Sequence, residues 1–319
     1  MLALFVLFAL VMCRYENEWN DFKLRFGRRY SDDEEYARFK IFKENMAQVN
    51  LLNKMDKSAT YGVTQFSDLT SDEFAHKYLN YAGLEQYGLQ RPTETMNNTT
   101  APKGIPEAYD WSTISGKMNP VQDQGSCGSC WSFASTAVLE SVNAIKHGNL
   151  PKLSEQQLVD CDKTNSGCNG GNLVLAAAWL KNNGLTYEAN YPYVGVDQTC
   201  KTTDWVVQLS NYQVVTGGEE VMRQKLYENG PLVIAINANP VQFYTGGVLD
   251  PEVCNPNALN HAVVAVGYDV TGNDGTKWWK IRNSWSKSWG ENGYFRMKYG
   301  SNTCGVANDV VMYTGTVQK

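Results

Sequence analysis

The sequence lacks an apolar run long enough to cross a membrane. Its longest such run, 2–12, has eleven residues, whereas a membrane-spanning helix needs about 20. That length is typical of the apolar core of a secretory signal peptide, and the charged sequence from Arg14 onward predicts a signal peptide over 1–13. We therefore expect a protein of the secretory pathway with no membrane anchor, destined for a lysosome or vacuole or for secretion.

Positive charge is not in excess either. The chain has 28 Lys and Arg residues against 33 Asp and Glu residues, a net charge of −5, and no run of basic residues. This balance argues against a nucleic-acid partner. With 319 residues, 43% of them hydrophobic, the chain can bury a substantial core and form one large domain or two smaller ones.

Cysteines become odd in number once such a signal peptide is removed. The eight stand at positions 13, 127, 130, 161, 168, 200, 254 and 304, and loss of Cys13 leaves seven. In an oxidising compartment six of these can form three disulfides, and one thiol stays free. Parity alone does not identify the free thiol.

The stretch around Cys130 predicts a reactive thiol at the start of a helix. It runs Gln124-Gly-Ser-Cys-Gly-Ser-Cys130-Trp-Ser-Phe. Apolar residues then recur at steps of three and four until Gly148 provides a stop: Ala134, Val138, Val142 and Ile145. The free N–H groups of a helix N-terminus favour the thiolate, which is the stronger nucleophile. The side-chain amide of Gln124 could hydrogen-bond a developing oxyanion.

This stretch resembles the Cys-Gly-Ser-Cys-Trp signature of the papain and cathepsin peptidases. The resemblance implies a cathepsin L-like cysteine endopeptidase that hydrolyses peptide bonds through a thioester acyl-enzyme, with no cofactor and no metal. It also implies that Cys130 is the free thiol. The implied disulfides are Cys127–Cys168, Cys161–Cys200 and Cys254–Cys304.

The first hundred residues resemble the inhibitory propeptide of cathepsin L-like enzymes. One face of a predicted helix over 32–53 carries the identities of the family's interrupted Glu-Arg-Phe-Asn-Ile/Val-Asn motif: Glu34, Arg38, Ile41, Phe42, Asn45, Val49 and Asn53. On spacing alone this would be an ordinary amphipathic helix. The stretch Gly62-x-Thr64-x-Phe66-x-Asp68 is similar to the second propeptide motif, with Thr64 where Asn is usual.

A linker is expected over 81–104, where periodicity is lost and Gly, Pro, Thr and Asn accumulate. Asn97 and Asn98 each begin an N-glycosylation triplet, which implies exposure in a secretory protein. Residues 105–111 resemble the mature N-terminus of the family. We therefore divide the chain into a signal peptide (1–13), an inhibitory propeptide (14–104) and a papain-like peptidase domain (105–319).

The mature part changes character near residue 211. Helical patterns precede that point, at 154–159 and 173–181, and short β-rich runs follow it, at 231–236, 261–268, 278–282 and 293–299. Helices followed by strands predict an α+β protein with two lobes, and a cleft between lobes is a common place for a site. The resemblance implies the papain-like fold, with a helical lobe, a β-barrel-like lobe and a helical propeptide before them.

Histidine is scarce, with only His76, His147 and His261, yet a thiol nucleophile needs a general base. His76 lies in the predicted propeptide and would be lost. His147 lies about 17 residues after Cys130, roughly 25 Å along a helix at ~1.5 Å per residue, and cannot reach it. His261 alone remains as the base.

Asn283 and Trp285, which follow the strand-like run 278–282, complete the predicted catalytic group. Asn283-Ser-Trp285 resembles the family's Asn-Ser-Trp motif, in which the Asn orients the histidine and the Trp covers their hydrogen bond. Without the other motifs, an Asn in a turn beside a core tryptophan would be the simpler interpretation. The next residue is Ser286, where relatives more often have Gly.

Substrate binding is assigned through the resemblance. The segment Cys168-Asn-Gly170-Gly171 is similar to the one whose glycine backbone pairs with an extended substrate, although such glycines can simply form a turn. The residues that the resemblance places around the S2 pocket, which takes the second residue before the cut, are Leu173, Ala235, Leu259, Ala262 and Asp309. An acid at the pocket floor would favour Arg at P2 beside Leu or Phe; the alternative is a solvated Asp at a strand edge.

Three other kinds of protein share parts of this sequence pattern: a thiol oxidoreductase, a zinc-binding protein and a non-catalytic inhibitor. Cys127-Gly-Ser-Cys130 is also a C-x-x-C of a thiol oxidoreductase, although Pro120-Val-Gln-Asp-Gln rather than a strand precedes it. Four of the cysteines could instead hold zinc. A non-catalytic inhibitor could share the propeptide motifs, but Gln124, Cys130, His261 and Asn283 are all present.

We expect protein and peptide substrates, the protein's own propeptide as inhibitor, and cystatin-like inhibitors as further partners of a monomer. No insertion suggests exopeptidase action, so an endopeptidase is the default. Activation by propeptide removal is expected at acidic pH, through protonation of carboxylates such as Asp68.

Overall fold

The computed structural model describes residues 15–88, 104–201, 203–251, 254–273 and 275–319. The predicted signal peptide, both glycosylation triplets and most of the predicted linker lie outside these residues. No helix in the described part of the chain is long and apolar enough to cross a membrane.

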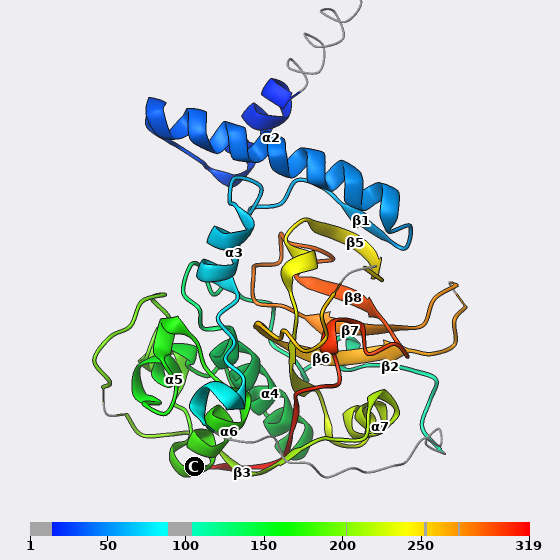
Figure 1. The fold of residues 1–319 in the computed structure, drawn as a ribbon. Coiled ribbons are helices and arrows are strands. Elements are labelled where there is room, and N and C mark those ends of the chain that lie inside the picture. The colour runs from blue at the N-terminus through cyan, green and yellow to red at the C-terminus, as the bar shows by residue number, and fades with distance from the viewer. Residues whose placement is uncertain (1–14, 89–103, 202, 252–253, 274) are drawn as a thin grey trace, which may run out of the picture.

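Three helices form one side of the molecule (Figure 1): α4 (Cys130–His147), α5 (Glu155–Cys161) and α6 (Leu173–Asn183). Helix α4 is buried along most of its length because it packs against strands β6 and β9 on the inner side. It ends at Gly148, whose left-handed backbone (φ 77°) suits glycine. Ser154 caps α5, and Asn172 caps α6 through its side-chain oxygen.

The other side is built on a mixed sheet in the order β1-β5-β8-β7-β6-β4-β9-β3, with β2 paired to β6. The strands are β1 (Ala59–Tyr61), β2 (Ala108–Asp110), β3 (Val207–Val214), β4 (Leu232–Ile236), β5 (Tyr244–Leu249), β6 (His261–Asp269), β7 (Trp278–Arg282), β8 (Tyr294–Lys298) and β9 (Val310–Gln318). A further helix, α7 (Glu219–Asn229), lies among them in sequence and was not predicted.

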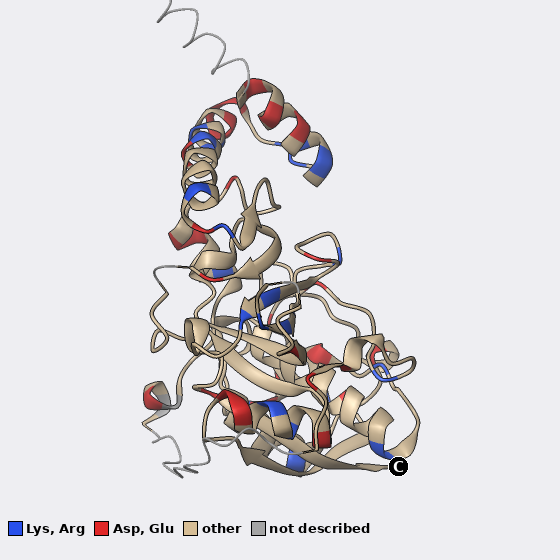
Figure 2. Cartoon of the chain, turned by 90° about the vertical axis from the view of Figure 1, so that its right-hand side faces the viewer, with Lys and Arg blue, Asp and Glu red and all other residues tan. Residues whose placement is uncertain are grey.

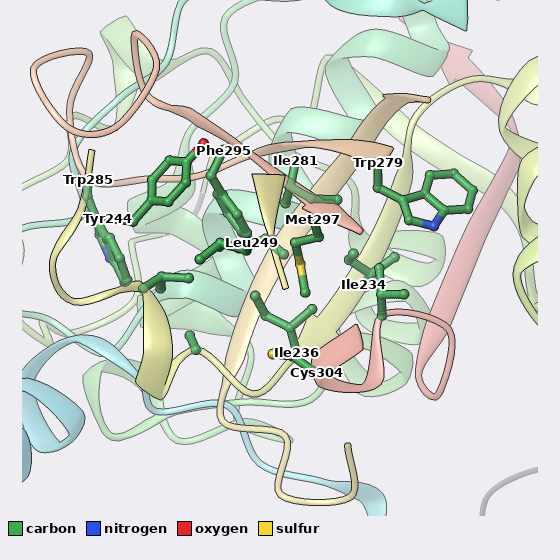
Figure 3. Close-up of a cluster of buried hydrophobic side chains, with 14 of the residues drawn as sticks. Ile234, Ile236, Tyr244, Leu249, Trp279, Ile281, Trp285, Phe295, Met297 and Cys304 are labelled. Carbon is green, nitrogen blue, oxygen red and sulfur yellow. The ribbon is translucent and has the colours of Figure 1, made fainter. Parts of the chain in front are cut away.

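The central strands are buried on both faces and separate two cores. In β4, Leu232, Ile234 and Ile236 face one core, whereas Val233 and Ala235 face the other, as the two-residue period of a strand requires. Figure 3 shows the first core, where aromatic side chains from several strands meet. The second core joins the sheet to α4 and α6.

The prosegment lies across the top of both sides (Figure 1). It comprises a helix over 15–26, α2 (Asp32–Met55), strand β1 and α3 (Ser71–Tyr78). Its helices carry residues of both signs of charge (Figure 2), with acidic residues gathered in the first turn of α2. Strand β1 extends the sheet by pairing antiparallel with β5, and this pairing fastens the prosegment to the mature part.

The two propeptide motifs contact each other. Asn45 donates from Nδ2 to the carbonyls of Ser67 and Leu69, at 2.9 and 2.8 Å. Asn53 exchanges two hydrogen bonds with the backbone of Tyr61. The helix residues therefore hold the second motif in place. Thr64, which departs from the usual Asn, donates its hydroxyl to the carbonyl of Gln242 at 2.7 Å.

The predicted mixed α+β architecture is confirmed, with one correction to the linker. The predicted helices at 130–147, 154–159 and 173–181 and the four predicted strands all form. The linker, however, does not begin at residue 81. Tyr81 pairs with Gly171 in a parallel bridge, and a short 3₁₀ helix covers Leu84–Tyr87. The first residues of the expected linker thus belong to the folded structure.

Candidate active site

Cys130 is the first residue of α4 and the one free cysteine of the described chain; its side chain is wholly buried. The other described cysteines form the pairs that the resemblance implies, Cys127–Cys168, Cys161–Cys200 and Cys254–Cys304. Cys127 therefore does not pair with Cys130 as a thiol oxidoreductase would require. The same disulfides use three of the four sulfurs of the alternative zinc site, those of Cys127, Cys161 and Cys168, and leave only that of Cys130.

His261 begins β6, directly across from the N-terminus of α4. The backbone N–H of the next residue, Ala262, donates to the Cys130 sulfur at 3.4 Å. His261 Nε2 donates to Asn283 Oδ1 at 2.8 Å, so that Nδ1 carries the lone pair. Within the described residues, Nδ1 makes no hydrogen bond, which leaves it available to accept the thiol proton.

Trp285 covers the histidine. Its ring stacks on the imidazole with centroids 4.7 Å apart, and its other contacts run into the first core, where Figure 3 shows it at one edge. Because that core fixes the indole, water is kept from the His261–Asn283 hydrogen bond. This is the arrangement that the Asn-Ser-Trp motif predicts.

Gln124 is held so that its amide nitrogen faces the site. Ser284 donates to its Oε1 at 2.6 Å, and the Gln124 backbone N–H donates to the Ser284 carbonyl at 2.9 Å. The Nε2 group donates to two carbonyls, that of Cys127 at 3.1 Å and that of Tyr78 at 3.2 Å. A carbonyl of the prosegment thus occupies one donor position of the predicted oxyanion hole.

Burial determines the protonation of Cys130 and His261, and it outweighs the effect of the helix N-terminus on the thiol pKa. It raises the pKa of the Cys130 thiol to about 12, although backbone N–H groups of Ala262, Trp131 and Cys130 act the other way. Burial also lowers the pKa of His261 to about 4, against the opposing hydrogen bond to Asn283. The sequence prediction of a lowered thiol pKa is therefore wrong for this form of the protein. In it both groups are neutral near pH 7.

Gly170 and Gly171 allow the prosegment backbone to approach closely. Gly171 N–H donates to the Asn80 carbonyl at 3.3 Å and its own carbonyl accepts from Ala82 N–H at 3.1 Å. A Cβ atom on Gly170 would lie 2.2 Å from the Asn80 oxygen, and one on Gly171 would lie 2.5 Å from the Trp131 ring. Glycine is required at both positions because no side chain fits.

Tyr81 of the prosegment shares an apolar cluster with four of the five residues predicted for the S2 pocket and bonds the fifth. Its ring, 4% exposed, packs in one apolar cluster with Leu173, Ala235, Leu259 and Ala262. Its hydroxyl donates to Oδ2 of Asp309. Asp309 is 3% exposed, so it is not the solvated acid at a strand edge that was the alternative prediction.

Sequence reasoning missed one residue of this pocket, Asn172. Its Nδ2 donates to the Tyr81 hydroxyl at 3.1 Å and to the Ala82 carbonyl at 3.0 Å. An Asn before an apolar helical run is a typical N-cap signal, and Asn172 does cap α6. Nothing local, however, indicates that the other end of the amide reaches a pocket.

The comparisons with known proteins agree with this geometry. Residues 105–314 match the family model described as papain family cysteine protease, and residues 19–74 match the cathepsin propeptide inhibitor domain. The chain is similar to the probable cysteine protease RD19B of Arabidopsis thaliana, with 43% identity over 311 residues that cover 91% of this chain and 84% of that protein. It is also similar to cathepsin F of Drosophila melanogaster, with 40% identity over 300 residues, which cover 90% of this chain and 48% of that protein.

Solved precursor structures match nearly the whole chain. The digestive procathepsin L 3 of Tenebrio molitor larval midgut superposes with a TM-score of 0.81 at 31% identity, over 94% of this chain and 99% of that one. The recombinant stem bromelain precursor superposes with a TM-score of 0.84 at 33% identity, over 95% of this chain and 99% of that one. The likeness therefore extends to the prosegment.

Proposed function

The chain belongs to the papain family of cysteine proteases and carries the family's propeptide inhibitor domain, and we propose that it is an endopeptidase activated by loss of that propeptide at acidic pH. The observation that carries the proposal is the site itself: Cys130 at a helix N-terminus, against a strand that begins with His261, whose ring Asn283 holds. In this proposal residues 14–104 are the propeptide and 105–319 the peptidase domain.

The acylation step follows from the positions of these groups. His261 Nδ1 takes the thiol proton, and the sulfur attacks the substrate's carbonyl carbon while the electron pair moves to oxygen. Gln124 Nε2 and the Cys130 N–H donate to that oxyanion; losing one such donor typically costs a factor of about 10²–10³ in turnover. When the C–N bond breaks, the imidazolium gives its proton to the leaving amine and a thioester remains.

Deacylation uses the same groups a second time. The imidazole takes a proton from water, the resulting nucleophile attacks the thioester, and the sulfur leaves and recovers its proton. Asn283 keeps Nε2–H bonded throughout, so that Nδ1 stays directed toward the reacting atoms. Both steps need only the residues described above.

The direction of the prosegment supports its inhibitory role. Its Tyr78 carbonyl lies at Gln124, and Tyr81, which fills the S2 pocket, comes three residues later. In a substrate the S2 residue precedes the cleaved bond. The prosegment therefore crosses the site in the opposite sense, and its bonds are not presented for cleavage.

The buried carboxylate of Asp309 supports acceptance of Arg at P2 beside Leu or Phe, because a desolvated acid favours a cationic partner. We further propose a signal peptide over 1–13, glycosylation at Asn97 and Asn98, a monomeric mature enzyme that cystatin-like proteins inhibit, and delivery to a lysosome or vacuole or secretion.

Acid incubation of the purified full-length chain tests the proposal. We expect a shorter product, beginning near residues 101–105 by N-terminal sequencing, that cleaves peptides and loses activity when iodoacetamide alkylates one cysteine. After processing by added pepsin, Cys130→Ser and His261→Ala should be inactive. His147→Ala is the matched control, because His147 bonds the Thr316 carbonyl far from the site. Retained proteolysis in Cys130→Ser would contradict the proposal.

A further inference from the structure

We infer that the S2 pocket selects tyrosine at P2 over both phenylalanine and arginine. The inference rests on the proposed function, since it names the side chain that the proposed pocket takes. It is carried by the chain's own Tyr81, whose ring fills that pocket and whose hydroxyl reaches its floor.

The pocket floor presents one hydrogen-bond acceptor and one donor to the same point. Asp309 Oδ2 accepts from the Tyr81 hydroxyl, and Asn172 Nδ2 donates to that hydroxyl's oxygen at 3.1 Å. Both floor residues are buried, Asp309 at 3% and Asn172 at 0% exposure. A hydroxyl group both donates and accepts, so it satisfies the two groups together.

The donor on this floor is fixed by the fold. Asn172 Oδ1 accepts from the N–H groups of Val174 and Leu175, at 2.8 and 3.3 Å, as the N-cap of α6. If the amide turned over, the helix would lose its cap, so Nδ2 must face the pocket. The backbone that carries the acceptor is also held, because the main-chain carbonyl of Asp309 accepts from Ala235 N–H of β4 at 3.0 Å.

Neither rival P2 side chain matches both groups. Phenylalanine fills the apolar walls but gives up the two hydrogen bonds, and a buried site built around a hydroxyl rejects the analogue without one. Arginine can pair with Asp309, but a guanidinium only donates and would turn N–H groups toward the N–H₂ of Asn172. The donor at Asn172 therefore distinguishes tyrosine from arginine.

Tyr81 can represent a P2 side chain although the prosegment runs in the opposite direction to a substrate. Tyr81 is the residue bridged to Gly171, and an extended substrate that pairs with Gly171 presents its own side chain at the same place. The distance from the strand to the floor is set by the pocket and not by the chain direction.

The test compares four peptide substrates that differ only at P2, with Tyr, Phe, O-methyltyrosine or Arg followed by Arg and a fluorogenic amide, on the mature enzyme made from the full chain. We expect kcat/KM for Tyr to exceed that for Phe by at least about tenfold, the effect of one hydrogen bond to a charged group. O-methyltyrosine should fall near Phe, because it accepts from Asn172 but cannot donate to Asp309.

Two variants assign the effect to the floor. In Asp309→Ala the Tyr-to-Phe ratio of kcat/KM should fall toward 1. Asn172→Asp keeps the oxygen that caps α6 but removes the donor, so the preference should move from Tyr to Arg. The comparison on the unaltered enzyme decides the question even if a variant fails to fold.

Equal rates for Phe and Tyr, or a higher rate for Arg than for Tyr, would overturn the inference and leave the endopeptidase intact. If no peptide is cleaved and iodoacetamide leaves Cys130 unmodified, the proposed function fails and the inference falls with it.

Discussion

Single residues of the site are held by neighbours that contribute no chemistry. The amide of Gln124 is oriented by Ser284, and the ring of His261 is oriented by Asn283. In each case a second hydrogen bond or a core contact fixes the supporting residue in turn. Reacting groups held this way lose little freedom on binding a substrate.

Ser286 has a strained backbone conformation. Its φ of 71° lies in the left-handed region that favours glycine, and its N–H donates to the Gln122 carbonyl at 2.9 Å, which links it to the loop before Cys130. We expect Ser286→Gly to raise the free energy of unfolding by about 0.5–1 kcal/mol, since relief of this strain exceeds the entropy that glycine costs.

Urea unfolding of the Cys130→Ser proenzyme, which cannot digest itself, measures this difference. Asn292→Gly serves as the control: its φ is 57°, but asparagine tolerates that region, so its gain should be smaller. An unchanged or lower stability for Ser286→Gly would show that the Ser286 hydroxyl, which accepts from Ser288, outweighs the strain.

At the scale of elements, the prosegment is fastened where α2 ends and β1 begins. Asp56 is the C-cap residue of α2, and its carboxylate accepts from Ser58, Ala59 and Tyr61, and from the Asp250 N–H of the mature part at 3.4 Å. Burial alone would raise the pKa of Asp56, but the hydrogen bonds from Ser58 and Tyr61 outweigh it and hold the pKa below its usual value.

The sign of this shift predicts weaker docking in acid. A carboxyl whose folded pKa is lowered stabilises the fold fully above its ordinary pKa, near 4, and this stabilisation is lost as the pH falls through the folded value. Asp56→Ala should therefore weaken prosegment docking by about 1–3 kcal/mol at neutral pH. Processing of the variant should then begin at a higher pH.

The pH at which half of the proenzyme is processed measures this effect, with Glu44→Ala as the control because Glu44 is an exposed acid on the same helix. Asp68→Ala extends the test to the carboxylate first expected to respond, which is buried beside Arg28 and Tyr30. A processing pH that stays unchanged in either variant removes that carboxylate from the trigger.

At the scale of the whole molecule, residues that belong to a short sequence motif could be predicted, whereas contacts between distant segments of the chain could not. Gln124, Cys130 and Asn283 lie in short motifs, and His261 could be selected because neither of the two other histidines can serve as the base. Helix α7 was missed because its polar pattern lies within a stretch dominated by short apolar strands. Asp309 was predicted, but Asn172 was missed as its neighbour, because both reach the Tyr81 hydroxyl only where the start of α6, the residue before β9 and the prosegment meet.

The protonation state of Cys130 was predicted wrongly for the same reason. A helix N-terminus is visible in the sequence and favours a thiolate. Residues some fifty positions earlier in the chain lie at the buried thiol: Tyr81 shares its apolar cluster, and the Tyr78 carbonyl reaches Gln124. The protonation of the Cys130 thiol therefore depends on the assembled proenzyme and not on the helix N-terminus alone.

This difference predicts a large change in thiol reactivity when the prosegment leaves. In the proenzyme a thiol pKa raised to about 12 and a histidine pKa lowered to about 4 leave no ion pair between pH 5 and 8, so alkylation should be slow across that range. Once water reaches the site, the burial penalty falls and the helix N-terminus and imidazolium favour the thiolate. We expect iodoacetamide to react at least about 100-fold faster with the mature enzyme at pH 6. Mass spectrometry of intact chains measures the rate, Cys130→Ser accounts for labelling elsewhere, and equal rates for the two forms would show that the prosegment does not set the protonation of the pair.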